Sequence, residues 1–149
     1  MDKYISLVKT KKFIGNQPIT FNKTTYNKEI EYFITPKLDG IRKLLLINGK
    51  ESFLISSKLQ FDKIILPEHS DLNNSLIDCE YYCNKVYCFD IIYYKGIDIR
   101  DLILSERILL LNEFNDILNS KKVIIKPYII NSNTYSICKN FFDIKNKYS

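Results

Sequence analysis

The feature that most constrains the fold is a pair of β-prone segments joined by a short polar turn. Within Ser75–Cys83, apolar or aromatic side chains alternate with carboxylates. Val86–Tyr94 is the most β-prone run in the chain. Asn84-Lys85 separates them. β-branched and aromatic residues fit a pleated surface, and two such runs around a two-residue turn are typical of neighbouring strands. The sequence therefore favours a fold built on a mainly antiparallel sheet.

The first of these segments separates its side chains by chemistry. With a period of two residues, Ile77, Cys79 and Tyr81 share one face of the strand, and Asp78 and Glu80 share the other. Two carboxylates on one face repel each other unless a metal ion or a cationic side chain lies with them. The pair is therefore either part of a binding site or a pair of solvated edge charges.

A second constraint comes from Glu31–Ile47, whose pattern predicts strand, tight turn, strand. A β-branched and aromatic run leads to Pro36, which cannot donate to a central ladder, so the turn is expected to begin there. Gly40 allows a backbone with positive φ, and a long apolar run broken by two basic residues follows it.

This turn carries a candidate nucleophile. Lys37 is expected at the edge of a sheet beside the carboxylate of Asp39, with Arg42 two residues past the glycine. A lysine on a stiff support can be a nucleophile when nearby positive charge keeps its amine unprotonated. The alternative is a polar hairpin tip with a solvated lysine, and Lys-x-Asp-Gly alone does not distinguish the two.

The remaining elements complete an α+β fold, in which helices flank the sheet. A helix is expected from its N-cap Ser105 to Leu118, and its core-facing stripe is Leu110, Phe114, Ile117 and Leu118. The other expected elements are a hairpin turn at Asn48-Gly49, a strand within Phe61–Leu66, an edge strand over Val123–Ile130 interrupted by Pro127, and a second helix over Thr134–Asn146.

Composition narrows the function classes. The 149 residues carry a formal charge of +5, which is compatible with a polyanionic partner such as RNA or a nucleoside triphosphate. Without a signal peptide or a membrane-spanning apolar run, we expect a soluble intracellular protein, cytoplasmic or nuclear, or in a virion if the AT-rich bias is viral. The reduced cysteines, without metal-binding spacing, are expected in the core, and His69 on a surface loop.

Five segments, in order, resemble the nucleotidyltransferase domain of mRNA capping enzymes, the guanylyltransferases. Their superfamily also contains ATP-dependent DNA and RNA ligases. Lys37-Leu38-Asp39-Gly40-Ile41-Arg42 is similar to the K-x-D-G-x-R nucleophile motif, and Phe13–Phe21, with its Gln-Pro, to the segment that precedes it in capping enzymes. The other segments are Phe53–Ile55 with Phe61, Leu76–Glu80, which resembles the D-G-E strand, and Tyr87–Ile92 followed by Gly96, Leu102 and Glu106-Arg107.

The resemblance implies an mRNA guanylyltransferase with a covalent intermediate. Lys37 would attack the α-phosphate of GTP, release pyrophosphate and pass GMP to the 5′-diphosphate end of RNA. Arg42 would contact the ribose or phosphate, Asp39 would orient the lysine, and both belong with Gly40 to the implied substrate-binding residues.

The resemblance extends to three further side chains. Phe61 would stack on the base. Glu80, with Asp78 beside it, would contact the nucleotide sugar or help to place Mg²⁺ or Mn²⁺, and Glu80 is the implied metal ligand.

The chain also departs from the family pattern. Ser56-Ser57 stand where the third motif has Asp-Arg, and Cys79 replaces the glycine of D-G-E. The later motifs, with a lysine pair that binds the α-phosphate, and the C-terminal OB-fold domain are not visible. Residues 1–149 are therefore expected to be a nucleotidyltransferase domain incomplete at its C-terminus, which aggregates alone or needs a second polypeptide.

Two alternatives remain beside the guanylyltransferase. One is an adenylyltransferase of the ATP-dependent RNA or DNA ligase type. The other is a non-catalytic fragment that binds nucleotide, RNA or a partner protein, which the missing lysines favour. Triphosphatase and methyltransferase activities would come from elsewhere.

Overall fold

The computed structural model describes residues 1–18 and 32–130. The chain divides into two compact units, one of Met1–Gly15 and Leu38–Ile125 and one of Asn16–Lys37 and Lys126–Ser149. The helix expected over residues 134–146 lies outside the described residues, and the expected single domain over residues 1–149 stays a prediction.

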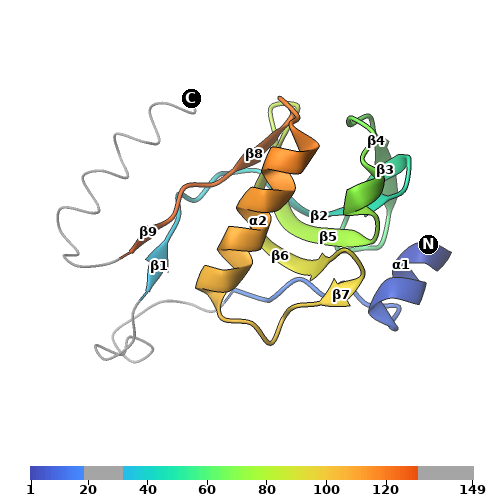
Figure 1. The fold of residues 1–149 in the computed structure, drawn as a ribbon, viewed down its shortest axis with the longest axis horizontal. Helices are drawn as coiled ribbons and strands as arrows, with labels where there is room; N and C mark the ends of the chain where they lie inside the picture. Colours follow the sequence, from blue (N-terminus) through green and yellow to red (C-terminus); the bar gives the residue numbers. More distant parts are fainter. Residues whose placement is uncertain (19–31, 131–149) are drawn as a thin grey trace. The chain divides into compact units, whose positions relative to one another are not determined.

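A mainly antiparallel sheet forms the centre of the first unit (Figure 1). Its strands follow the order β4-β3-β2-β5-β6-β7 with antiparallel neighbours, and β8 pairs with β6 in parallel. This arrangement confirms the α+β fold class. The strands are β2 (Ile41–Asn48), β3 (Glu51–Ile55), β4 (Phe61–Ile64), β5 (Ser75–Tyr82), β6 (Lys85–Tyr94), β7 (Ile97–Asp98) and β8 (Val123–Ile125).

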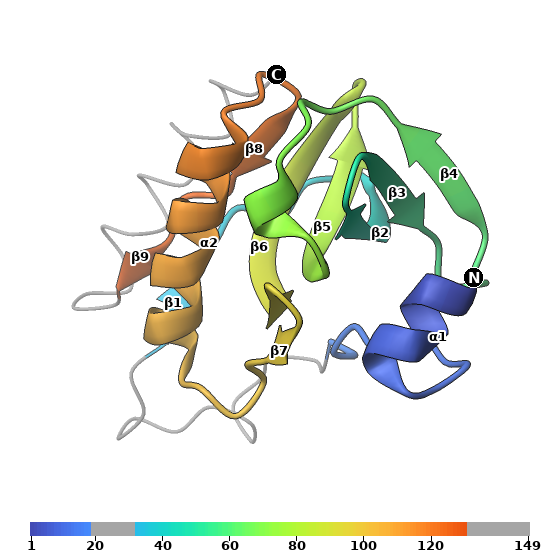
Figure 2. The same cartoon turned by 45° about the vertical axis from the view of Figure 1, so that its right-hand side comes forward.

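Helices cover both faces of this sheet (Figure 2). The helices are α1 (Asp2–Val8), the short 3₁₀ helix η1 (Ser70–Leu72) and α2 (Leu104–Leu118). Leu44 and Leu45 are neighbours in β2, so their side chains point to opposite faces. Leu44 packs in a cluster with residues of α1, and Leu45 packs in a cluster with residues of α2.

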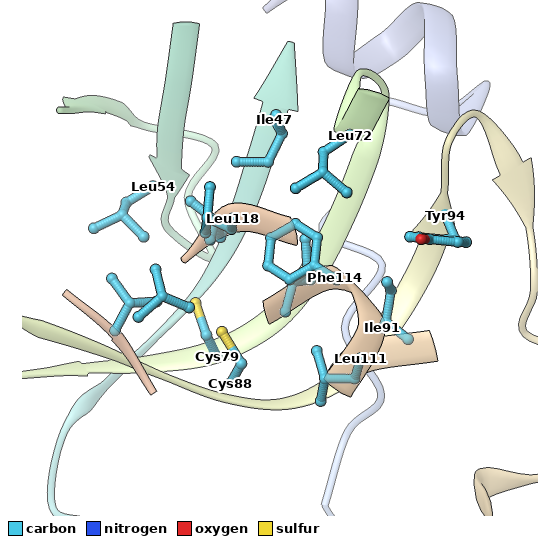
Figure 3. Close-up of a cluster of buried hydrophobic side chains, with 14 of the residues drawn as sticks. Ile47, Leu54, Leu72, Cys79, Cys88, Ile91, Tyr94, Leu111, Phe114 and Leu118 are labelled. Atoms are coloured by element: carbon cyan, nitrogen blue, oxygen red, sulfur yellow. The ribbon is translucent and has the colours of Figure 1, made fainter. Parts of the chain in front are cut away.

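The cluster under α2 confirms the helix and corrects its details (Figure 3). Leu111, Phe114 and Leu118 are fully buried, whereas the expected stripe residues Leu110 and Ile117 are only partly buried. The buried face of α2 is therefore rotated relative to the predicted stripe. Figure 3 also shows the thiols of Cys79 and Cys88, register partners in β5 and β6, side by side in this core.

The predicted N-cap of α2 is wrong. The helix begins at Leu104, and its N-cap is Ile103, which makes no side-chain capping bond. The amides of Glu106 and Arg107 donate to the Ile103 carbonyl, so Ser105 already lies inside the first turn. The predicted end is confirmed, because Asn119 adopts the left-handed conformation that terminates the helix.

Two hairpin turns occur one residue away from their predicted places. β2 and β3 are joined through Gly49 and the next residue, with Gly49 at φ 61°, instead of Asn48-Gly49. β5 and β6 are joined through Cys83 and Asn84, at φ 47° and 63°, instead of Asn84-Lys85. Two-residue loops of this kind require positive φ, which explains both positions.

The lysine segment is not the predicted hairpin. In the second unit, β1 (Phe33–Ile34) pairs antiparallel with β9 (Ile129–Ile130) and not with β2, which pairs with β3 and β5 (Figure 1). Residues 35–40 have no regular structure. Pro36 ends the ladder, as its missing N–H predicts, but the strand it ends has a partner far away in sequence.

Burial separates the cysteines. Cys79 and Cys88 are buried and Cys83 is exposed, so the core prediction is confirmed for the first two and wrong for the third. His69 is half-buried, and its Nε2 lies 2.9 Å from the Leu118 carbonyl at the end of α2. Within residues 1–18 and 32–130, no helix is long and apolar enough to span a membrane.

Candidate functional site

The central feature of the candidate site is an ion pair between two neighbouring strands. In the register of β2 and β5, Arg42 lies opposite Glu80, and Leu44 lies opposite Asp78. Arg42 donates from Nε to Oδ1 of Asp78 over 3.0 Å and from Nη2 to Oδ2 over 2.5 Å. The cationic side chain expected beside the two carboxylates is therefore Arg42.

Burial makes this pair depend on both partners. The Asp78 side chain is 4% exposed and that of Arg42 is 28% exposed. Burial raises the pKa of Asp78, and the hydrogen bonds and charge of Arg42 oppose that shift. The hydrogen bond to Asp78 in turn raises the pKa of Arg42. Arg42 is thus a fixed positive charge with one edge, Nη1, directed away from the two bonds to Asp78.

Two aromatic rings complete the surroundings of the guanidinium. Its Cζ lies 5.8 Å from the ring centroid of Phe13 and 5.8 Å from that of Phe89 on β6. Both distances are within the range of cation–π attraction. Bidentate hydrogen bonding fixes the plane of the Arg42 guanidinium, and the rings restrict its movement further.

Gly15 brings the backbone directly over the ion pair. A Cβ atom at this position would lie 2.5 Å from Cε1 of Phe13, 2.9 Å from Nη2 of Arg42 and 3.2 Å from Oδ2 of Asp78. The first distance is shorter than any ordinary contact, so a side chain here would displace the ring. The absence of a side chain at Gly15 lets the segment close over the pair.

Gly40 has a different role from the predicted one. It does not have a positive φ; among the described glycines, Gly49 and Gly96 do. A Cβ atom at Gly40 would lie 3.0 Å from the Tyr81 carbonyl oxygen and 3.3 Å from Cβ of Glu80. Gly40 therefore permits close approach to β5.

The two carboxylates of β5 differ in their contacts with Arg42. Both oxygens of Asp78 accept hydrogen bonds from Arg42, whereas the half-buried Glu80 is the register partner of Arg42. Within the described part of the chain, no group of three His, Cys, Asp or Glu side chains could bind a metal ion. A divalent ion at Glu80 would therefore need phosphate oxygens and water as its other ligands, which is common for Mg²⁺.

Phe61 lies at the edge of the sheet, in β4, and makes contacts within the protein. Its ring packs edge-to-face on Tyr4, with centroids 6.1 Å apart, and on Phe53, with centroids 6.4 Å apart. These contacts belong to the cluster on the α1 face. Stacking of Phe61 on a base stays a prediction.

Lys37 and Asp39 are both exposed. Lys37 is the last residue of the first segment of the second unit, and Asp39 belongs to the first unit. In the second unit, Thr35 donates from Oγ1 to the Pro127 carbonyl over 3.0 Å, which anchors the strand two residues before Lys37.

A comparison with models of known protein families shows which family the chain belongs to. A model of the mRNA capping enzyme catalytic domain matches residues 2–148. The chain belongs to this family. A search of curated protein sequences returned no match.

In this capping-enzyme domain, a second ion pair joins two parts of the last segment that carried the resemblance. Arg107 of α2 donates from Nε and Nη2 to the two carboxylate oxygens of Asp90 on β6, over 2.8 and 3.0 Å. Its Nη1 also donates to the Leu102 carbonyl. The pair ties the start of α2 to the sheet.

Sequence reasoning missed four residues of the capping-enzyme domain whose contacts or burial the structure shows. Phe13 and Gly15 lie in the segment that carried the resemblance, but nothing local shows that they pack on Arg42. Phe89 belongs to a strand whose other residues are mostly core. Lys126 is buried, with 5% exposure, although nothing in the apolar run before it indicates this burial.

Proposed function

We propose that this capping-enzyme domain is an mRNA guanylyltransferase that transfers GMP from GTP through a covalent intermediate on Lys37. The observation that carries the proposal is the segment Lys37–Arg42, which has the nucleophile pattern, in a chain matched by the family over residues 2–148. The exposure of Lys37 is consistent with an accessible amine.

The covalent step forms a bond between Lys37 and the α-phosphorus of GTP and breaks the bond from this phosphorus to pyrophosphate. The Lys37 ammonium first loses one proton to solvent, and the Nζ lone pair attacks the α-phosphorus of GTP. The bond from this phosphorus to the bridging oxygen breaks, and pyrophosphate leaves with that electron pair. The nitrogen loses a second proton to solvent, which leaves a lysine–GMP phosphoramidate. A terminal phosphate oxygen of the 5′-diphosphate end of RNA then attacks the same phosphorus. The phosphorus–nitrogen bond breaks, and the Lys37 nitrogen leaves with that electron pair and takes up two protons from solvent.

Arg42 supplies the substrate-binding charge in this proposal. Its guanidinium is fixed by Asp78 and the two rings, so little rotamer entropy remains to be lost when Nη1 donates to a ribose or phosphate oxygen. Asp78 acts through Arg42, because both of its oxygens accept hydrogen bonds from that side chain and it is only 4% exposed itself. Asp39 and Gly40 lie in the short segment between the nucleophile and Arg42.

Glu80 is the residue that would bind Mg²⁺ or Mn²⁺ with the phosphates of the nucleotide, or would contact its sugar. When bound, the ion neutralises charge on the phosphates during transfer. Phe61 would stack on the base. A second polypeptide would supply the triphosphatase and methyltransferase activities, or any phosphate-binding groups that this chain lacks.

The test is incubation with α-labelled GTP or ATP and Mg²⁺, followed by denaturing electrophoresis. We expect label from GTP on the wild type and on Lys58→Ala, an exposed-lysine control, but not on Lys37→Ala. Labelled protein should then pass GMP to RNA with a 5′-diphosphate end. Label from ATP alone would assign the chain to ligase-type chemistry, and the absence of any label would refute the proposal.

A further inference from the structure

We infer that Arg107 is a positioning residue of the nucleotidyl-transfer site: by holding Asp90, it keeps the Asp78 carboxylate in place and the Arg42 guanidinium aimed at the nucleotide. The inference rests on the proposed function, in which Arg42 supplies the substrate-binding charge. All four side chains belong to the first unit. In this role Arg107 acts through two carboxylates and does not itself contact the nucleotide.

The first step of the argument is the closeness of two carboxylates on neighbouring strands. Asp78 of β5 and Asp90 of β6 are register partners. Directly opposite residues of an antiparallel pair have Cβ atoms about 5 Å apart, and like charges at such positions repel each other. Burial is the main cause of the raised pKa of Asp78, and the charge of Asp90 raises this pKa as well. The two side chains are therefore close enough to act on each other.

Each of these carboxylates has an arginine of its own. Arg42 of β2 makes two hydrogen bonds to Asp78, over 3.0 and 2.5 Å, and Arg107 of α2 makes two to Asp90, over 2.8 and 3.0 Å. The side chains of Arg107 and Asp90 are only 14% and 15% exposed. The four side chains together carry no net charge, so the arginines offset the repulsion between the carboxylates.

The strand β6 gives Arg107 a second link to the site. The register of β5 and β6 shifts directly after the Asp78 pair, and Phe89 is the extra residue of β6 at this irregularity. The centroid of the Phe89 ring lies 5.8 Å from Cζ of Arg42. Because Arg107 fixes the neighbouring Asp90 carboxylate, it also restricts the part of β6 that packs against the Arg42 guanidinium.

Loss of the Arg107 charge would leave the Asp90 carboxylate uncompensated beside Asp78. Since Asp90 is mostly shielded from water, solvent would screen the repulsion poorly. We expect the Asp78 carboxylate to be displaced, and the Arg42 guanidinium with it, because two hydrogen bonds fix the guanidinium plane to that carboxylate. A displaced Arg42 would bind the ribose or phosphate less well, so more GTP would be needed for labelling.

The same ion pair also ties α2 to the sheet, and the two roles predict different results. Figure 3 shows Leu111 and Phe114 of α2 beside Ile91 of β6, so this helix packs on the strand that carries Asp90. The tie is lost whenever either partner is removed. Positioning fails only when a charged Asp90 remains without Arg107, so the additional change Asp90→Asn should restore it.

The test measures the rate of covalent labelling against GTP concentration for wild type, Arg107→Met, Arg107→Lys and the double variant Arg107→Met with Asp90→Asn. Arg100→Met is the matched control, because it removes an exposed arginine that is paired with Asp98. We expect Arg107→Met to raise the half-saturating GTP concentration about 10-fold, as for the loss of a hydrogen bond to a charged group, with little change in the maximal rate. The double variant, Arg107→Lys and the control should stay within about 3-fold of wild type.

Thermal melts by circular dichroism separate labelling from stability. The double variant still lacks the tie between α2 and β6, so it should melt below wild type although its labelling is restored. If Arg107→Met does not fold, Arg107→Gln replaces it in both measurements, because glutamine can donate a hydrogen bond to Asp90 without carrying a charge.

The other results are equally informative. Wild-type half-saturation in a folded, uncharged Arg107 variant overturns this inference and leaves the proposed function intact. A double variant that labels no better than Arg107→Met shows that the pair is only a structural tie, which also overturns it. Label from ATP alone overturns the proposed function, and the same comparison with ATP then tests the inference. No label on the wild type from GTP or ATP overturns both.

Discussion

The ion pair of Arg42 and Asp78 gives the sharpest prediction about stability. Asp78→Ala leaves a guanidinium that is 28% exposed without its carboxylate, which is itself 4% exposed in the wild type. Removing one partner of a buried pair costs about 3–5 kcal/mol. Since Arg42 can still reach water, we expect a loss near the lower end, about 3 kcal/mol in the free energy of unfolding measured with urea.

A double-mutant cycle separates the pair from the packing around it. Arg42→Ala should be similarly destabilising, but the double variant should cost less than the sum, with a coupling energy of about 2 kcal/mol. Additive losses, within about 0.5 kcal/mol, would refute the assignment of the two side chains to one interaction.

The pH dependence of the stability of Arg42→Ala gives an independent check of the ion pair. In Arg42→Ala the hydrogen bonds and the charge that oppose the effect of burial are gone, so burial and the charge of Asp90 raise the pKa of Asp78 further. A carboxyl whose folded pKa lies above the unfolded value, about 3.9, binds a proton on folding. The stability of this variant should therefore be greatest below that pH and should fall as the pH rises, relative to wild type.

Two further predictions concern single positions. Gly15→Ala should lower the free energy of unfolding in urea by about 1–3 kcal/mol, because the new methyl group would lie 2.5 Å from a ring carbon of Phe13 and 2.9 Å from the Arg42 guanidinium. An unchanged stability would show that the segment around Gly15 does not close over the pair of Arg42 and Asp78. Hydrogen bonds from Arg100 lower the pKa of Asp98 to about 2, so wild type should lose this contribution as the pH falls from about 4 toward 2, and Asp98→Asn should remove that slope. Both side chains are more than a third exposed, so the effect should stay below about 1 kcal/mol, and equal slopes in thermal melts would contradict it.

Local patterns predicted the parts of the fold that depend on neighbours in sequence. The alternation in β5 correctly separated Ile77 and Cys79 from Asp78 and Glu80, because a strand has a strict period of two. The helix α2 was predicted for the same reason from its own periodicity. The predicted positions of the β2–β3 and β5–β6 turns were wrong by one residue, because several residues near each turn tolerate the positive φ that it requires.

Contacts between distant segments could not be predicted in this way. The pairing of β1 with β9 leaves no mark in either short segment, so Glu31–Ile47 was interpreted as a hairpin. The closeness of Gly15 to Arg42 joins two segments that are distant in sequence, so neither local pattern shows it. The sequence offered a cation beside the two carboxylates as one of two alternatives. It did not show that Arg42 is this cation or that both Asp78 oxygens accept its hydrogen bonds.

The central claim is that Lys37 becomes covalently attached to GMP, and peptide mapping tests it most directly. The full chain is incubated with GTP and Mg²⁺, digested, and analysed by mass spectrometry under conditions that preserve phosphoramidates. The account predicts that the mass of GMP is added to the peptide that contains Lys37, and to that side chain. Unmodified protein, or GMP on a different residue, would contradict it.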